Sequence, residues 1–155
     1  MYTARKNNKN MEVINILVYA ENEGVLWEYR NLLQEIELEN SYMFKLTLTS
    51  RSYTVLEQIK LMRENVDIYL SYSTVQTKGR FLTAQIREKY PECHIIQRKE
   101  KGYYHEYHVE DDIYLEEVWL PTKKILKDKI IFILKKIVGK SEHDRSVKDN
   151  VLGNS

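Results

Sequence analysis

The sequence has a single cysteine, Cys93, among its 155 residues, together with only 2 prolines and 5 glycines. One cysteine cannot form an internal disulfide, which suits the reducing cytoplasm. No apolar run approaches the roughly 20 residues needed to span a bilayer. Residues 1–12 form a polar leader without the apolar core of a signal peptide. We therefore expect a cytoplasmic protein with no membrane partner.

An excess of charge is also lacking, since 24 Lys and Arg residues against 23 Asp and Glu residues leave a net charge of +1. This balance gives no electrostatic reason to expect binding to nucleic acid or to a membrane. Neither of the glycine-rich phosphate loops, GxGxxG and GxxxxGK(S/T), occurs, and no GxSxG elbow occurs either. No cofactor is expected. Tyrosine, by contrast, is abundant, with 12 copies, and can mark either interaction surfaces or the edges of a core.

Short apolar runs alternate along the chain with segments of helical periodicity. The predicted strands are Val13–Tyr19, Met43–Ser50, Val66–Tyr72, His94–Gln97 and Val118–Leu120. The predicted helices run from Val25, from Ser52, from Gly79 to Tyr90, and from Lys123 to Val138, with Gly139 just after the last one. Residues 98–117 fit a strand about as well as a helix. We place the domain at residues 13–139 and a linker or tail at 140–155.

The spacing of the apolar residues also predicts which side chains face the core. The inward positions are Leu26, Tyr29, Leu32, Leu33 and Ile36; Val55, Leu56, Ile59 and Met62; Phe81, Leu82 and Ile86; and Ile125, Leu126, Ile130, Ile133, Leu134 and Ile137. Met43–Ser50 alternates between apolar and polar residues, which is typical of a strand near a sheet edge. Strands alternating with helices predict a parallel sheet covered on both faces. The leading topology is a three-layer, flavodoxin-like α/β domain with five parallel strands in the order 2-1-3-4-5.

Three segments, INILVYAENE, YTVLEQIK and VDIYLSYSTVQTKGRFLTAQIREKYPECHII, carry a family resemblance that extends over residues 13–138. They resemble the receiver domain of two-component response regulators, particularly of receivers that precede a LytTR DNA-binding domain. The resemblance implies an aspartate after the third strand that accepts a phosphoryl group, and two acids after the first strand that hold Mg²⁺. It also implies a Ser or Thr after the fourth strand and a Lys after the fifth, which bind the phosphoryl oxygens.

Carried over position by position, this pattern is broken at four places. The acid pair falls on Ala20 and Glu21, the acceptor on Ser71, the hydroxyl residue near Arg98 or Lys99, and the lysine at Leu120-Pro121. One acid makes a weak Mg²⁺ site, and serine is not the carboxylate nucleophile that this transfer uses. Asp67 or Glu21 could replace the acceptor, but Asp67 lies at the start of its strand, the wrong end of a parallel sheet. We expect a degenerate pocket and no enzymatic activity.

Two further groups of residues have possible chemistry. His105 and His108 lie among acidic residues, where His and carboxylate ligands could hold a metal ion, or where they could simply belong to a solvated acidic loop. We favour the loop and predict no metal site. Cys93 and His94 are adjacent on a strand and should point to opposite faces, so they do not form a catalytic pair.

The last predicted helix has more apolar surface than its inner stripe needs, and it follows an acidic segment, residues 103–117. Because receivers dimerise through this region, the resemblance implies a homodimer in which the acidic segment meets the basic helix. Its interface would comprise Tyr107, Tyr114, Trp119, Ile131, Phe132 and Lys135. The alternative is solvated charge around a broad core helix.

Together these features predict a pseudo-receiver that acts as an interaction and dimerisation module, and that forms the N-terminal part of a transcriptional regulator. Another protein could also bind it, and DNA would be bound only by a further domain beyond Ser155. One alternative is an enzyme subunit similar to phosphotransferase-system IIB, although the loop Ala20–Gly24 lacks the cysteine that this class requires. Another is a small-ligand sensor that binds beside Glu21, Ser71 and Lys99.

Overall fold

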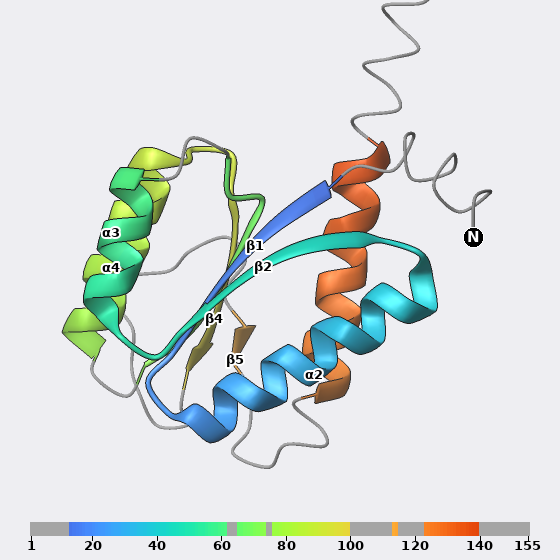
Figure 1. Cartoon of the computed structure of the whole chain (residues 1–155), viewed down its shortest axis with the longest axis horizontal. Helices are drawn as coiled ribbons and strands as arrows, with labels where there is room; N and C mark the ends of the chain where they lie inside the picture. Colours follow the sequence, from blue (N-terminus) through green and yellow to red (C-terminus); the bar gives the residue numbers. More distant parts are fainter. Residues whose placement is uncertain (1–12, 62–64, 74–75, 100–112, 115–122, 140–155) are drawn as a thin grey trace, which may run out of the picture.

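The computed structural model describes residues 13–61, 65–73, 76–99, 113–114 and 123–139. A parallel sheet lies between two layers of helices (Figure 1). The elements follow one another as β1 (Val13–Ala20), α2 (Glu23–Asn40), β2 (Met43–Thr49), α3 (Ser52–Leu61), β3 (Ile68–Tyr72), α4 (Gln76–Lys89) and β4 (His94–Lys99). A last helix covers residues 123–139. None of the helices in these described ranges is long and apolar enough to cross a membrane.

The four strands β1 to β4 lie in the order β2-β1-β3-β4, and every neighbouring pair is parallel. The predicted three-layer fold and the order 2-1-3-4 are therefore confirmed. Beside β4 the structure assigns only two residues, β5 (Ile113–Tyr114). The predicted fifth strand, Val118–Leu120, lies outside the described residues and stays a prediction.

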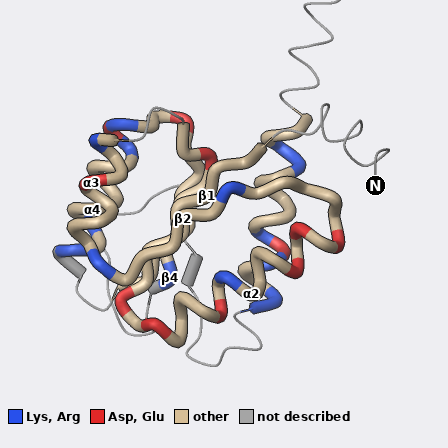
Figure 2. Tube along the Cα trace, in the orientation of Figure 1, with Lys and Arg blue, Asp and Glu red and all other residues tan. Residues whose placement is uncertain are grey.

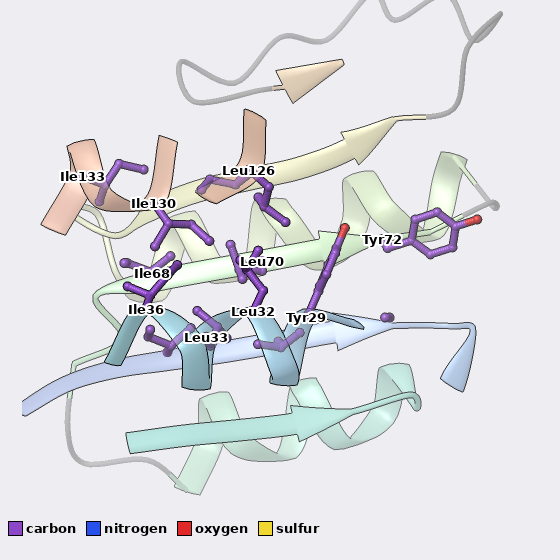
Figure 3. Packing of buried hydrophobic residues seen from close by; sticks show 14 of the residues in the cluster. Tyr29, Leu32, Leu33, Ile36, Ile68, Leu70, Tyr72, Leu126, Ile130 and Ile133 are labelled. Atoms are coloured by element: carbon purple, nitrogen blue, oxygen red, sulfur yellow. The ribbon is translucent and has the colours of Figure 1, made fainter. Parts of the chain in front are cut away.

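Each face of the sheet is covered by its own apolar cluster. In the first apolar cluster, alternate residues of β1, including Ile16 and Val18, pack against α2 and the last helix. In the second apolar cluster, Leu17 and Tyr19 pack against α3 and α4. Figure 3 shows the first cluster, in which side chains of α2 and of the last helix meet over β3. β1 and β3 are almost wholly buried, as expected for strands covered on both faces.

The strand β2 is different, because most of its side chains are only half-buried and, among the strands that the structure describes, it pairs with β1 alone. The prediction that this alternating strand lies near a sheet edge is confirmed.

The helix α2 begins earlier than predicted. Its first residue is Glu23, and the side-chain oxygen of Asn22 accepts hydrogen bonds from the backbone N–H groups of Gly24 (2.7 Å) and Val25 (3.3 Å). Asn22 is therefore an N-cap rather than part of an irregular loop. A Cβ on Gly24 would lie 2.9 Å from that oxygen, so glycine suits this first turn.

Several inward-facing predictions need correction. Phe81 of α4 and Ile125 of the last helix are 52% and 44% exposed, because Leu82 with Ile86, and Leu126 with Ile130, set the buried stripe one position further along each helix. The helix α4 begins at Gln76 rather than Gly79, β3 begins at Ile68 rather than Val66, and Gly139 is still helical. The other inward positions that are described are buried or half-buried.

The two helices on the first face are also joined by ion pairs. Lys127 Nζ lies 3.1 Å from Glu35 Oε2 and 2.8 Å from Glu39 Oε2, and Lys123 Nζ lies 3.3 Å from Glu35 Oε1. Figure 2 shows acidic residues of α2 beside basic residues of the last helix. These side chains are partly solvated, so the apolar packing beneath them holds the helix in place more than the charges do.

Candidate functional site

The candidate site lies at the carboxyl ends of β1, β3 and β4. The strand order reverses between β1 and β3, and in open parallel sheets ligands bind at the carboxyl ends where such a reversal occurs. The backbone N–H of Glu21 donates to the carbonyl of Tyr72 (3.3 Å), which ties the two strand ends together. Side chains extend from this edge toward both helical layers.

On the side of α3 and α4, the only remaining acid of the pair is already hydrogen-bonded. Glu21 Oε1 accepts hydrogen bonds from the hydroxyl of Ser73 (2.7 Å) and from that of Tyr19 (3.2 Å). Burial, followed by the negative charge of Glu21 and the hydrogen bond to it, raises the pKa of Tyr19 above its ordinary value. The phenol therefore stays protonated and continues to donate to the carboxylate.

Ser71, at the position where the family resemblance places the phosphoacceptor, is only 3% exposed. It pairs in register with Tyr19, and its neighbour Tyr72 pairs with Ala20. Ala20 is itself fully buried in the first apolar cluster. Ala20, Glu21 and Ser71 thus all lie at the carboxyl edge, although Ala20 packs on the α2 face, and they offer one carboxylate where a metal-assisted transfer uses several oxygens.

On the side of α2, a group of large side chains fills the ends of β3 and β4. Arg98 is 7% exposed, and its guanidinium carbon lies 5.0 Å from the ring centroid of Tyr72, in cation–π contact. The buried Tyr29 extends from α2 toward the same strand ends (Figure 3). We call Tyr29, Tyr72 and Arg98, together with the nearby Glu28, the aromatic–arginine cluster.

Burial raises the pKa of two groups in this cluster, Tyr29 and Glu28. Burial raises the pKa of Tyr29, and the adjacent Arg98 guanidinium opposes that rise only in part. Burial also raises the pKa of Glu28, again against the attraction of Arg98. Within the described part of the chain, neither Nη1 of Arg98 nor Oε2 of Glu28 has a hydrogen-bond partner, although both atoms are buried. Such atoms are costly to leave unpaired.

The alternative acceptor, Asp67, lies at the opposite, amino-terminal end of the sheet. Its carboxylate accepts a hydrogen bond from the backbone N–H of Asn15 (2.8 Å), while its own N–H donates to the Asn15 carbonyl (2.9 Å). The N–H of His94 donates to the Asp67 carbonyl (3.0 Å). Asp67 therefore joins β1, β3 and β4 and has no part in the candidate site.

Cys93 lies at the same amino-terminal end, buried within the second apolar cluster. Its position is far from the loop after β1 where a IIB-like subunit would carry its thiol, so the structure gives that alternative no support. His105 and His108 are outside the described residues. In the ranges that are described, no group of three His, Cys, Asp or Glu side chains could hold a metal ion.

Several other predicted site residues fall where little or nothing is described. Lys99 is the last residue of β4, at the carboxyl edge of the sheet, and Tyr114 belongs to β5. The side chains of both are outside the part of the chain that the structure describes. Pro121, Tyr107 and Trp119 are also outside it.

The predicted interface residues that are described lie on the last helix. Phe132 is 52% exposed, Lys135 is exposed and Ile131 is half-buried. Lys129 and Lys136 place their ammonium groups 5.7 Å and 4.5 Å from the Phe132 ring centroid. An exposed aromatic ring thus stands in a basic setting on this helix.

Five residues of the candidate site were not identified as site residues from the sequence, namely Tyr19, Glu28, Tyr29, Tyr72 and Ser73. The sequence did indicate that Tyr72 and Ser73 lie near the site, because these two residues directly follow Ser71 at a strand end. Tyr29 was predicted to face the core, and that burial is confirmed, but its proximity to Arg98 depends on how α2 crosses the sheet.

No protein-family model matches the chain, and no curated protein matches its sequence. Solved structures do match its fold. A response regulator receiver protein from Sinorhizobium medicae WSM419 superposes with a TM-score of 0.62 at 17% identity, over 80% of this chain and 96% of that one. A response regulator receiver domain protein from Clostridium thermocellum gives 0.56 at 15% identity, over 79% and 95%. The chain therefore has the flavodoxin-like fold of receiver domains.

Proposed function

We propose that this domain is a pseudo-receiver, a signalling module that works by binding proteins and does not accept a phosphoryl group. The observation that carries the proposal is the state of the carboxyl edge. A buried Ser71 occupies the acceptor position, and the one remaining acid of the predicted metal-binding pair, Glu21, is engaged by the hydroxyls of Tyr19 and Ser73. The receiver fold supports the signalling role, and the chemistry of these residues supports the loss of phosphoacceptance.

Two physical requirements of phosphoryl transfer are unmet at this edge. Mg²⁺ prefers six oxygen ligands in near-octahedral geometry, and one hydrogen-bonded carboxylate is a poor start for such a site. The nucleophile is a carboxylate in the receiver reaction, whereas a serine hydroxyl needs a neighbouring base to become reactive. The neighbours of Ser71 in the sheet are Tyr19, whose raised pKa keeps it protonated, and Gln97, whose amide is not a base.

The test of this proposal is treatment with acetyl phosphate or beryllofluoride and Mg²⁺, followed by amide NMR spectra. We expect the spectra to stay unchanged, while a receiver with its full set of acids responds under the same conditions. Shift changes clustered around Glu21 and Ser71 would overturn the proposal. The variant Ser71→Ala is the matched control, since any labelling that persists in it does not involve the Ser71 hydroxyl.

The same proposal assigns the protein-binding role to the last helix and the acidic segment 103–117, in a homodimer. Phe132, Ile131 and Lys135 support it, because an exposed aromatic ring beside lysines suits an acidic, tyrosine-rich partner surface. We further propose that the domain is the N-terminal part of a transcriptional regulator, a point that the full gene product beyond Ser155 would decide.

The dimer is tested by sedimentation of Phe132→Ser beside Phe81→Ser. Both phenylalanines are 52% exposed, so each variant removes an equally solvated ring. We expect only Phe132→Ser to weaken the dimer. Equal behaviour of the two variants would contradict this assignment of the interface.

A further inference from the structure

The outer edge of β2 offers a second surface with a defined chemistry. β2 is the outermost strand, and it pairs with β1 from Met43 to Thr49. No other described strand lies along its free side. Figure 1 shows β2 at the sheet edge, between α2 and α3. Unpaired strand edges are templates for further strands, and proteins commonly protect them with charges, prolines or bulges.

One hydrogen bond shows which backbone groups point outward. The N–H of Phe44 donates to Glu37 Oε2 at 2.7 Å, so it does not point toward β1. The N–H and C=O groups of one strand residue point to the same side, and this side alternates along the strand. Leu46 and Leu48 therefore also direct their backbone groups outward. Neither makes a hydrogen bond on that side to any other residue that the structure describes.

We propose that β2 pairs with β2 of a second copy, in antiparallel orientation about a two-fold axis at Thr47. In this register Leu46 lies opposite Leu48 of the partner copy and exchanges both backbone hydrogen bonds with it. The symmetry repeats the exchange at Leu48. The outward groups of both leucines are then satisfied, and two sheets become one continuous sheet.

The contact between Glu37 and Phe44 disfavours registers whose axis lies nearer the start of β2. A shift of the axis to Leu46 or to Lys45 would require the Phe44 N–H, which Glu37 already occupies. The shift to Lys45 would also place two lysines directly opposite each other, which is unfavourable. With the axis at Thr47, Lys45 lies opposite Thr49, and the two Thr47 side chains face each other.

The strand itself has few features that would prevent such pairing. Its sequence, MFKLTLT, has one charge and no proline, and it is rich in residues that favour strands. The side chains of Leu46 and Leu48 pack against the first apolar cluster. They would also contact each other across the new pair of β2 strands. The net charge of +1 sets up no strong repulsion between copies.

The register is tested by disulfide trapping in the full chain. Thr47→Cys places two thiols directly opposite each other, within the Cα separation that a disulfide needs. With an added oxidant such as diamide, we expect rapid formation of a covalent dimer. Lys45→Cys is the matched control, because its two copies would lie about 13 Å apart along the strands. The native Cys93 is buried and should not react.

Sedimentation of reduced, uncrosslinked protein provides the second measurement. Thr47→Lys puts like charges face to face and should weaken the association at least about threefold, whereas Thr47→Val keeps a β-branched pair and should change it little. Equal trapping of the Lys45→Cys and Thr47→Cys variants, or no trapping of Thr47→Cys, would overturn the proposal. Adding Phe132→Ser to Thr47→Cys should leave the trapping intact, so the failure of either interface can be told apart from failure of the other.

Discussion

The two ends of the sheet are closed in different ways. At the amino-terminal end, Asp67 makes short hydrogen bonds to the backbones of β1 and β4 and leaves these groups paired. At the carboxyl end, Tyr72, Arg98 and Tyr29 close the edge mainly by packing and by the cation–π contact of Arg98 with Tyr72. The first end is therefore held mainly by hydrogen bonds, and the second mainly by packed side chains.

The largest expected effect comes from removing the packing at the carboxyl end. Tyr72→Ala deletes a ring that is almost wholly buried and its contact with Arg98, and should cost about 3 kcal/mol of unfolding free energy. Urea denaturation measures this loss. Tyr72→Phe keeps the ring and should lose much less. A cost for Tyr72→Ala below about 1 kcal/mol would mean that packing does not close this end.

A smaller effect is expected at the amino-terminal end. Asp67→Ala removes the acceptor of the Asn15 N–H and should cost about 2 kcal/mol, because a partly buried donor loses its partner. Asp67→Asn retains a side-chain oxygen and should recover most of the stability. Equal losses for the two variants in urea denaturation would show that the charge of Asp67, rather than the hydrogen bond, matters here.

The smallest effect concerns Glu28 and depends on pH. Because burial raises its folded-state pKa, the protein favours neutral Glu28, and this contribution is lost as the pH rises through the raised value. Glu28→Gln should therefore raise the melting temperature slightly near pH 8 and leave it unchanged below about pH 4, the ordinary range of a glutamic acid. A gain that is the same at both pH values would contradict this assignment.

Much of the fold could be predicted because it depends on local patterns. The apolar runs at Val13–Tyr19 and His94–Gln97 specified buried strands, and the alternation from Met43 specified the edge strand. The errors in the predicted inward-facing residues arose where two adjacent apolar residues could each lie on the buried face of a helix. Phe81 lies next to Leu82, and either could have faced the core, so the arrangement of α4 on the sheet decided between them.

The candidate site was predictable only in part. The strand ends at Ala20 and Ser71 could be located from the sequence, and the structure brings them together. The sequence placed Ser73 next to Ser71, but it could not predict the hydrogen bond from Ser73 to Glu21, which joins residues far apart in the chain. The proximity of Tyr29 to Arg98 could not be predicted either. Contacts of this kind depend on the crossing of helices and strands in space, which periodicity does not encode.

The sharing of one sheet between two clusters also bears on how the chain folds during synthesis. The cluster under α3 and α4 uses residues up to Ile95, so it can close once that strand has left the ribosome. The opposite cluster needs Leu126, Ile130, Ile133 and Leu134 as well as α2. Until that last helix emerges, the α2 face of β1 and β3 lacks part of its cover, and a nascent chain is most exposed to chaperones and to aggregation during this interval.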